Sequence, residues 1–175
     1  MHRVWALLAA AGLLFAVTAR ASDSSLSPAA NTAFVTASAK QPGTVVRPSG
    51  LQYRIIRSGF GKKPQPNDSV SVNYKGALIN GKVFDSTEPG FPATMKVNEV
   101  IPGWTEALEL MREGDHWQLI IPSNLAYGER GAGDGTIPPN QTLVFDLELI
   151  TVTPAPPEPK KDDDDQGGSG GGASQ

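Results

Sequence analysis

The feature that most limits the fold of this chain is an alternation of apolar and polar side chains, which recurs in several short segments between residues 50 and 152. Successive side chains of a strand point to opposite faces of a sheet, so a period of two predicts half-buried strands. The segments that we expect to be strands are residues 51–55, 70–74, 116–121 and 142–152. In the last of them one face carries Leu143, Phe145, Leu147 and Leu149, and the other carries Asp146 and Glu148.

A helical pattern is convincing in one segment only. Trp104, Ala107, Leu108 and Met111 stand at i, i+3, i+4 and i+7, and Gly114 is the expected stop. An Asn80-Gly81 pair predicts a hairpin turn. Several strands around one short amphipathic helix indicate an α+β fold, with the helix packed on one face of an antiparallel sheet.

The first 21 residues are typical of a secretory signal peptide. A basic start that includes Arg3 precedes an uncharged Ala- and Leu-rich run over residues 4–19, and small residues flank Arg20 at the end. The alternative is a membrane anchor, but an anchor usually needs about 20 apolar residues. We therefore expect export, to the periplasm first and to the outside as the alternative, and no membrane span in the mature chain.

The segments on either side of residues 50–152 have compositions that disfavour a packed core. Residues 22–49 are rich in Ser, Ala and Thr, and we expect a linker or weakly ordered lead-in there. Residues 153–175 combine a Pro-rich stretch, an Asp run and a Gly-rich end, which predicts a disordered tail. The expected organisation is thus one domain, residues 50–152, between two appendages.

Composition excludes several functional classes. The chain has no cysteine, which rules out disulfides, thiol nucleophiles and thiolate zinc sites. Its net charge of -3 offers no basic excess, so we expect no nucleic-acid partner. His116 is the one histidine beyond the signal segment and has no nucleophile elbow to accompany it, so a surface or packing role is expected. We expect neither a metal nor a cofactor.

Aromatic residues are the remaining candidates for a site, because they stand at strand ends and at the helix start, next to loops. The default interpretation is that such rings pack in the hydrophobic core. Tyr127, just ahead of a loop, has a hydroxyl that can point into a cavity, and Asp85 can accept a hydrogen bond from a tyrosine. The rings in question are Tyr74, Phe84, Phe91, Trp104, Tyr127 and Phe145.

Five motifs surround these residues, in order and at compatible spacing. They are Val72-Asn-Tyr-Lys-Gly76, Gly81-Lys-Val-Phe-Asp-Ser86, Val100-Ile-Pro-Gly-Trp104, Leu125-Ala-Tyr-Gly128, and Ile137-Pro-Pro-Asn140 with Leu143-Val-Phe-Asp-Leu147. Together they resemble the FKBP-type peptidyl-prolyl cis-trans isomerases, most of all the bacterial macrophage infectivity potentiator (Mip) type. The resemblance runs over residues 50–152 and implies a strongly bent sheet wrapped around the short helix.

The resemblance also implies a site and an activity. Asp85, Tyr127 and the backbone of Ile101 would carry catalysis, and Trp104 would be the floor of a proline pocket. The other expected pocket residues are Tyr74, Phe84, Phe91, Val100, Ile137 and Phe145. The expected partners are proline-containing polypeptides, and macrolide inhibitors of the family would take the same pocket. The alternative is a non-catalytic module that binds proline segments or acts as a chaperone.

An isomerase of this kind needs no nucleophile, because an X-Pro bond is held by amide resonance with a barrier of about 20 kcal/mol. A dry aromatic pocket disfavours the planar polar amide relative to the twisted one.

Residues 22–49 show no sign of the long helical dimerisation region of full-length Mip-type proteins, so we expect a monomer.

Overall fold

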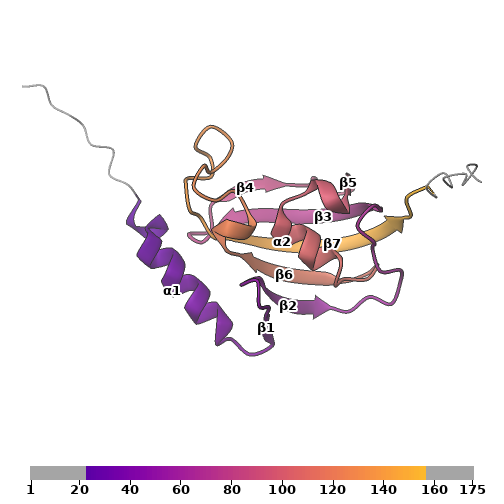
Figure 1. The fold of residues 1–175 in the computed structure, drawn as a ribbon, viewed down its shortest axis with the longest axis horizontal. Coiled ribbons are helices and arrows are strands. Elements are labelled where there is room, and N and C mark those ends of the chain that lie inside the picture. The colour runs from indigo at the N-terminus through magenta and orange to yellow at the C-terminus, as the bar shows by residue number, and fades with distance from the viewer. Residues whose placement is uncertain (1–22, 157–175) are drawn as a thin grey trace, which may run out of the picture.

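The structure, a computed structural model, describes residues 23–156 and is built on one seven-stranded antiparallel sheet (Figure 1). The strand order is β1-β2-β6-β7-β3-β4, and β5 also pairs with β3. The strands are β1 (Thr44–Val46), β2 (Gln52–Arg57), β3 (Ser69–Leu78), β4 (Val83–Ser86), β5 (Ala93–Lys96), β6 (His116–Ile121) and β7 (Leu143–Thr153). The open, curled sheet holds helix α2 (Pro102–Leu108) against one face, which confirms the expected α+β fold.

The alternation of side chains predicts most of this sheet correctly. In β7 the four apolar residues of the expected inner face are buried, and Asp146 on the other face is exposed. Gly81 has φ +85° in the turn between β3 and β4, as the hairpin prediction requires. Strand β2 departs from the alternation at two positions, since Ile55 is 47% exposed and Gln52 is 2% exposed.

Helix α2 is shorter than its sequence pattern predicts. It ends at Leu108, well before Gly114, although Met111 still lies fully buried in the core. The helix approaches β6 closely, because a Cβ atom on Gly103 would lie 2.4 Å from Cγ2 of Ile121. Glycine at this position therefore lets the start of α2, and with it Trp104, lie directly against the sheet.

The described part of the expected lead-in over residues 22–49, which is residues 23–49, differs most from the sequence prediction, because it contains regular secondary structure. Its elements are the short 3₁₀ helix η1 (Ser24–Leu26), helix α1 (Pro28–Ala39) and strand β1. The Ser27 side chain accepts a hydrogen bond from the backbone N–H of Ala30 and caps α1, and Pro28 occupies the first position of the helix. The folded unit therefore begins before residue 50.

Helix α1 packs on the face of the sheet opposite to α2. A cavity beside α1 is lined by Gln118, Ile120 and Val144, which alternate along their strands with the core residues Leu119 and Ile121 and Phe145 that face α2. Figure 1 shows α1 at the side of the sheet, next to β1. The two helices thus lie on different faces of one sheet.

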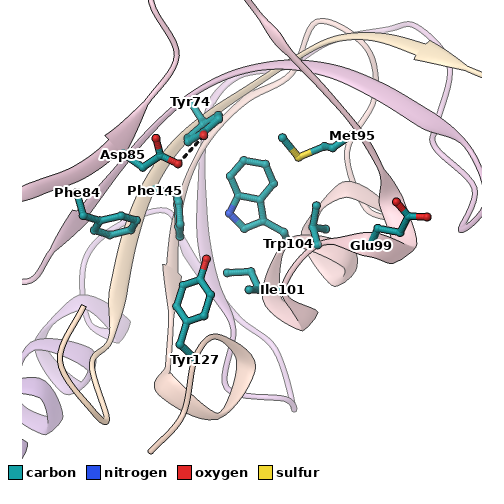
Figure 2. Close-up of a pocket in the computed structure, with 10 residues that line it drawn as sticks. Tyr74, Phe84, Asp85, Met95, Glu99, Ile101, Trp104, Tyr127 and Phe145 are labelled. Carbon is teal, nitrogen blue, oxygen red and sulfur yellow. Dashed lines mark hydrogen bonds between the residues drawn. The ribbon is translucent and has the colours of Figure 1, made fainter. Parts of the chain in front are cut away.

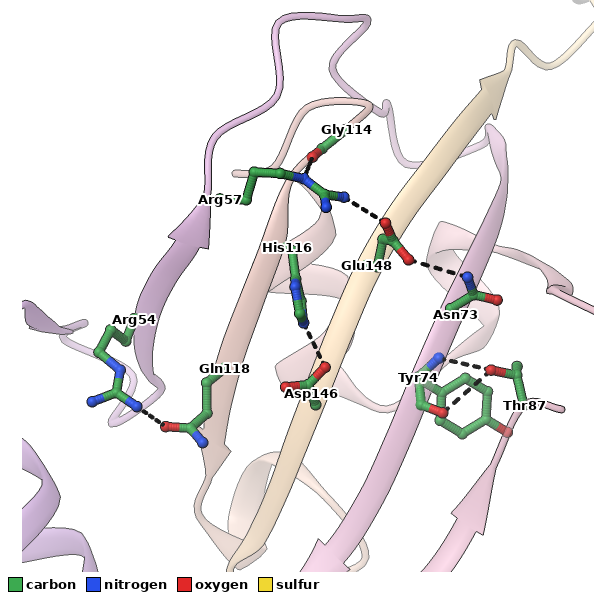
Figure 3. A network of polar contacts seen from close by, with 10 residues as sticks. All are labelled: Arg54, Arg57, Asn73, Tyr74, Thr87, Gly114, His116, Gln118, Asp146 and Glu148. Atoms are coloured by element: carbon green, nitrogen blue, oxygen red, sulfur yellow. Dashed lines mark hydrogen bonds and ion pairs between the residues drawn. The ribbon is translucent and has the colours of Figure 1, made fainter. Parts of the chain in front are cut away.

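The rest of this outer face carries a polar network, seen in Figure 3. Arg57 pairs with Glu148, which also accepts a hydrogen bond from the Asn73 amide. Nε2 of His116 lies 2.5 Å from Oδ1 of Asp146, so the histidine has the surface role expected of it. Exposed pairs of this kind contribute little stability, about 0–1 kcal/mol each.

Residues 1–22 and 157–175 lie outside the described part of the chain. The signal-peptide prediction falls on the first segment and most of the predicted tail on the second. Thr153, which we assigned to the tail, is the last residue of β7. Among residues 23–156, no helix has the length and apolar character needed to cross a membrane.

Candidate functional site

A cavity of about 340 Å³ opens between the start of α2 and the β3, β4 and β7 strands (Figure 2). Strands supply Tyr74, Phe84, Phe145 and the Asp85 carboxylate, the start of α2 supplies Trp104, and the loop after the 3₁₀ helix η3 (Ser123–Leu125) supplies Tyr127. The residues that line it are Tyr74, Phe84, Asp85, Met95, Glu99, Val100, Ile101, Trp104, Tyr127 and Phe145.

The floor of this cavity is a set of aromatic rings in edge-to-face contact. The ring of Trp104 lies 5.2 Å from those of both Tyr74 and Phe145, at interplanar angles of 85° and 82°. Phe84 meets Phe145 at 5.6 Å and 86°. Aromatic rings favour this arrangement, because the positive edge of one faces the negative face of the other. With Trp104 and Phe145 each 4% exposed, the rings form a rigid apolar base.

Gly76 in β3 allows two of these rings to approach the sheet. A Cβ atom at Gly76 would lie 2.7 Å from ring carbons of both Phe145 and Phe84. Any side chain there would displace the rings, so the shape of the pocket depends on glycine at this position.

The polar side chains beside the aromatic rings of the cavity are two tyrosine hydroxyls and the Asp85 carboxylate. The Tyr74 hydroxyl donates to Oδ2 of Asp85 at 2.6 Å, which is the tyrosine–aspartate bond expected from the sequence. Burial, together with that hydrogen bond and the charge of Asp85, raises the pKa of Tyr74 to about 12. Burial and the same charge also raise the pKa of Tyr127. Both hydroxyls therefore keep their protons at neutral pH and remain donors.

Tyr127 and Ile101 provide hydrogen-bonding groups that the protein itself leaves free. The Tyr127 side chain is 39% exposed, and its hydroxyl points into the space bounded by Asp85, Phe145 and Trp104 (Figure 2). Ile101 caps α2, and its carbonyl accepts from the N–H groups of Trp104 and Thr105. Within residues 23–156, the Ile101 N–H donates to no other group.

The structure brings together eight of the ten residues expected in the site. The eight are Tyr74, Phe84, Asp85, Val100, Ile101, Trp104, Tyr127 and Phe145. Phe91 does not join them, because it lies in the loop between β4 and β5 and is 73% exposed. Ile137 is buried in the core, and its backbone pairs with Ala132 instead of lining the cavity.

Sequence reasoning missed two lining residues, Met95 at the end of β5 and Glu99 in the 3₁₀ helix η2 (Val97–Glu99). Both residues come before Val100, where a motif begins. The position of the segment directly ahead of that motif was the signal that could have located them. Glu99 pairs with Lys96 at 2.8 Å, which places a charged pair at the rim.

A family model and curated relatives identify the same family for this chain. The family model described as FKBP-type peptidyl-prolyl cis-trans isomerase matches residues 61–150. The outer membrane protein MIP of Legionella longbeachae is 56% identical over 124 residues, which are 70% of this chain and 53% of that protein.

Two solved structures agree in fold. A peptidyl-prolyl cis-trans isomerase from Pseudomonas syringae matches with a TM-score of 0.68 at 40% identity, over 72% of this chain and 92% of that one. FkpA from Escherichia coli matches with a TM-score of 0.70 at 44% identity, over 73% of this chain and 60% of that one. The chain spans about half the length of the curated relatives it matches.

Proposed function

Because the chain belongs to the family of FKBP-type peptidyl-prolyl cis-trans isomerases, we propose that its aromatic cavity accelerates the isomerisation of X-Pro bonds in polypeptides. The observation that carries this proposal is the rigid base of Tyr74, Trp104 and Phe145 beneath unused donors at Ile101 and Tyr127. The proline ring would rest on Trp104.

The proposed chemistry is non-covalent. A planar amide is more polar than one twisted about its C–N bond, because twisting removes the resonance. Transfer of the proline amide from water to an apolar cavity therefore costs the planar ground state more than the twisted transition state. The Ile101 N–H and the Tyr127 hydroxyl would hold substrate carbonyls during rotation.

The decisive experiment is a refolding assay on a protein whose slow phase is limited by a prolyl bond. An isomerase added at sub-stoichiometric concentration accelerates that phase, whereas the alternative, a proline-binding or chaperone module, leaves its rate unchanged. An unchanged rate would overturn the proposed activity. If a macrolide ligand of the family inhibits the acceleration, the isomerase activity resides in this cavity.

Substrate choice follows from the rim of the cavity. Phe84 and Ile101 offer apolar surface, and no Lys or Arg is among the residues that line it. We therefore propose broad selectivity with a mild preference for an apolar residue before proline. Peptides that differ only at that residue test this proposal, and a strong preference for an acidic residue would contradict it.

We also propose that the protein is exported, with the periplasm as its site of action. Residues 1–21 have the features of a signal peptide, and the Legionella relative is described as an outer membrane protein. Cell fractionation combined with N-terminal sequencing tests this, and recovery of the uncleaved chain from the cytoplasm would contradict it.

A further inference from the structure

The segment that carries Tyr127 has a backbone conformation that depends on its surroundings. Ala126 has φ −127° and ψ −116°, which is neither helical nor extended, and Gly128 has φ +55°. Asn140 has φ +60°, a left-handed conformation that is uncommon for a residue with a side chain. Glycine adopts a positive φ freely, but at Ala126 and Asn140 such conformations persist only where neighbouring contacts hold them.

One of those contacts ties the Tyr127 segment to residues near the start of β7. The N–H of Asn140 donates to the carbonyl of Gly128 at 2.8 Å, and the N–H of Gly128 donates to the carbonyl of Ser123 at 2.8 Å. The residue directly after Tyr127 is therefore bonded on both sides. A shift of Asn140 would therefore act on the Gly128 carbonyl, one residue after Tyr127.

The two residues after Asn140 are held in turn by a side chain of helix α1. Oδ1 of Asn31 accepts from the N–H of Thr142 at 2.7 Å, and Nδ2 of Asn31 donates to Oε1 of Gln141 at 3.2 Å. Nδ2 also donates to the carbonyls of Leu26 and Ser27. Asn31 is 6% exposed, so these bonds are shielded from water.

Gln141 completes the connection. Its amide donates to the carbonyl of Leu26 at 3.1 Å and to that of Pro139 at 3.0 Å, and the side chain is 6% exposed. The backbone on both sides of Asn140 is thus fixed to the η1–α1 region. A buried polar network in which each group has a partner allows one arrangement.

We propose that Asn31 is a positioning residue, which sets the place of the Tyr127 hydroxyl through Gln141, Thr142 and Asn140. This inference rests on the proposed isomerase function, because it concerns a group expected to bond the substrate. Asn31 itself does not line the aromatic cavity. It lies against a separate cavity of about 330 Å³, opposite Pro122 and Ser123 at the start of the Tyr127 segment.

The test compares a variant that cuts this connection with one that loosens α1 elsewhere. In Asn31→Ser the hydroxyl can bond the Ser27 carbonyl one turn back but is too short to reach Thr142. Gln52→Leu is the matched control, because the Gln52 amide donates to the carbonyl of Val35 at 3.0 Å and so ties α1 to β2, away from Asn140.

We expect Asn31→Ser to lower kcat/KM about three- to fivefold and by no more than Tyr127→Phe does, mainly through kcat, because a misplaced hydroxyl contributes less in the transition state. Gln52→Leu should leave kcat/KM unchanged. In a Tyr127→Phe background the effect of Asn31→Ser should shrink to less than about twofold, since both changes act on one hydroxyl. An equal loss in both backgrounds, or no loss in either, would overturn the proposal.

A second measurement does not depend on activity. The backbone amide resonances of Tyr127 and Gly128 should shift in Asn31→Ser and stay in place in Gln52→Leu. Unmoved resonances in a folded Asn31→Ser protein would overturn the proposal. If Asn31→Ser does not fold, Gln141→Ala removes the bonds of the Gln141 amide to Asn31, Leu26 and Pro139 from the loop side while the Thr142 bond stays, and the same resonances must move. If the unaltered chain fails to isomerise prolyl peptides, the proposed function is wrong, and these resonances still decide the role of Asn31.

Discussion

Individual residues of the cavity combine apolar rings with hydroxyls that stay protonated. The Tyr74 hydroxyl is committed to Asp85, whereas the Tyr127 hydroxyl forms no hydrogen bond to another residue in the described part of the chain. Since burial and the Asp85 charge raise the pKa of both phenols, both stay protonated near neutral pH and keep an O–H to donate. Tyr127 therefore offers an exposed donor to a substrate carbonyl, whereas the Nε1–H of Trp104, which also lacks a partner, is buried.

We predict that Tyr127→Phe lowers kcat/KM for a proline peptide roughly two- to tenfold, which corresponds to about 0.5–1.5 kcal/mol for one neutral hydrogen bond. The circular dichroism spectrum and Tm should hardly change, because the ring remains. Tyr53→Phe is the matched control: Tyr53 stacks on Trp117, with ring centroids 4.3 Å apart, outside the cavity. An equal loss in both variants would contradict the assignment.

Asp85→Leu should also lower kcat/KM, because it frees the Tyr74 hydroxyl and removes the charge at the mouth of the cavity. Asp85 is exposed, so the fold should keep its circular dichroism spectrum and Tm. Asp146→Leu makes the same change on the outer face of the sheet, where the carboxylate pairs with His116. If Asp85→Leu unfolds the protein, Asp85 is structural and its assignment to the site is wrong.

At the scale of elements, the contact between α2 and β6 sets the floor of the cavity. We predict that Gly103→Ala destabilises the fold by about 1–3 kcal/mol, because the added Cβ atom would overlap Ile121. Thermal or urea unfolding measures the loss. Ile121→Ala removes the overlapping atoms, so the double variant should lose less stability than the sum of the two single variants. Strict additivity would show that the two residues do not press on each other.

The elements that could be predicted from the sequence are those in which buried and exposed residues recur at a regular spacing. β3, β6 and β7 place apolar residues on one face, so alternation alone locates them. Helix α1 has no such signal, because most of its residues are small Ala, Ser and Thr, and its side-chain-mediated hydrogen bonds to the rest of the domain run from Asn31 to Gln141 and Thr142 and from the Gln52 amide to the Val35 carbonyl. A polar connection of this kind has no periodic pattern and is visible only in the folded chain.

Among the site residues too, those that a regular element positions could be predicted from the sequence, whereas two residues in loops, Phe91 and Ile137, lie elsewhere. Residues on strands and at the start of α2 lie where the motifs predict, because the element fixes the direction of the side chain. Phe91 stands in the loop between β4 and β5, where no periodicity sets its direction, and it points to solvent. Ile137 belongs to a matching motif, but its apolar side chain gains more from the core than from the cavity.

At the scale of the whole molecule, α1 is bonded to its own domain through Asn31, which accepts from the N–H of Thr142, and through Gln52, which donates to the Val35 carbonyl, so these contacts are satisfied within one chain. We predict that the protein is a monomer after removal of residues 1–21. Light scattering at several concentrations measures the mass. A stable dimer would contradict this prediction, and loss of that dimer in Gln52→Leu would trace it to an exchange of α1 between chains.

The proton on the Tyr74 hydroxyl should also make the free energy of unfolding of the whole molecule depend on pH. A tyrosine in the unfolded chain titrates near pH 10, whereas Tyr74 keeps its proton to about 12 in the folded chain. The folded state therefore binds more protons between these pH values, and the free energy of unfolding should fall as pH rises from about 10 to about 12. The contribution is fully present below pH 10. Tm measured across this range should fall less steeply in Tyr74→Phe than in the unaltered protein. Equal slopes would mean that Tyr74 titrates alike in both states, and the bond to Asp85 would then not hold its proton.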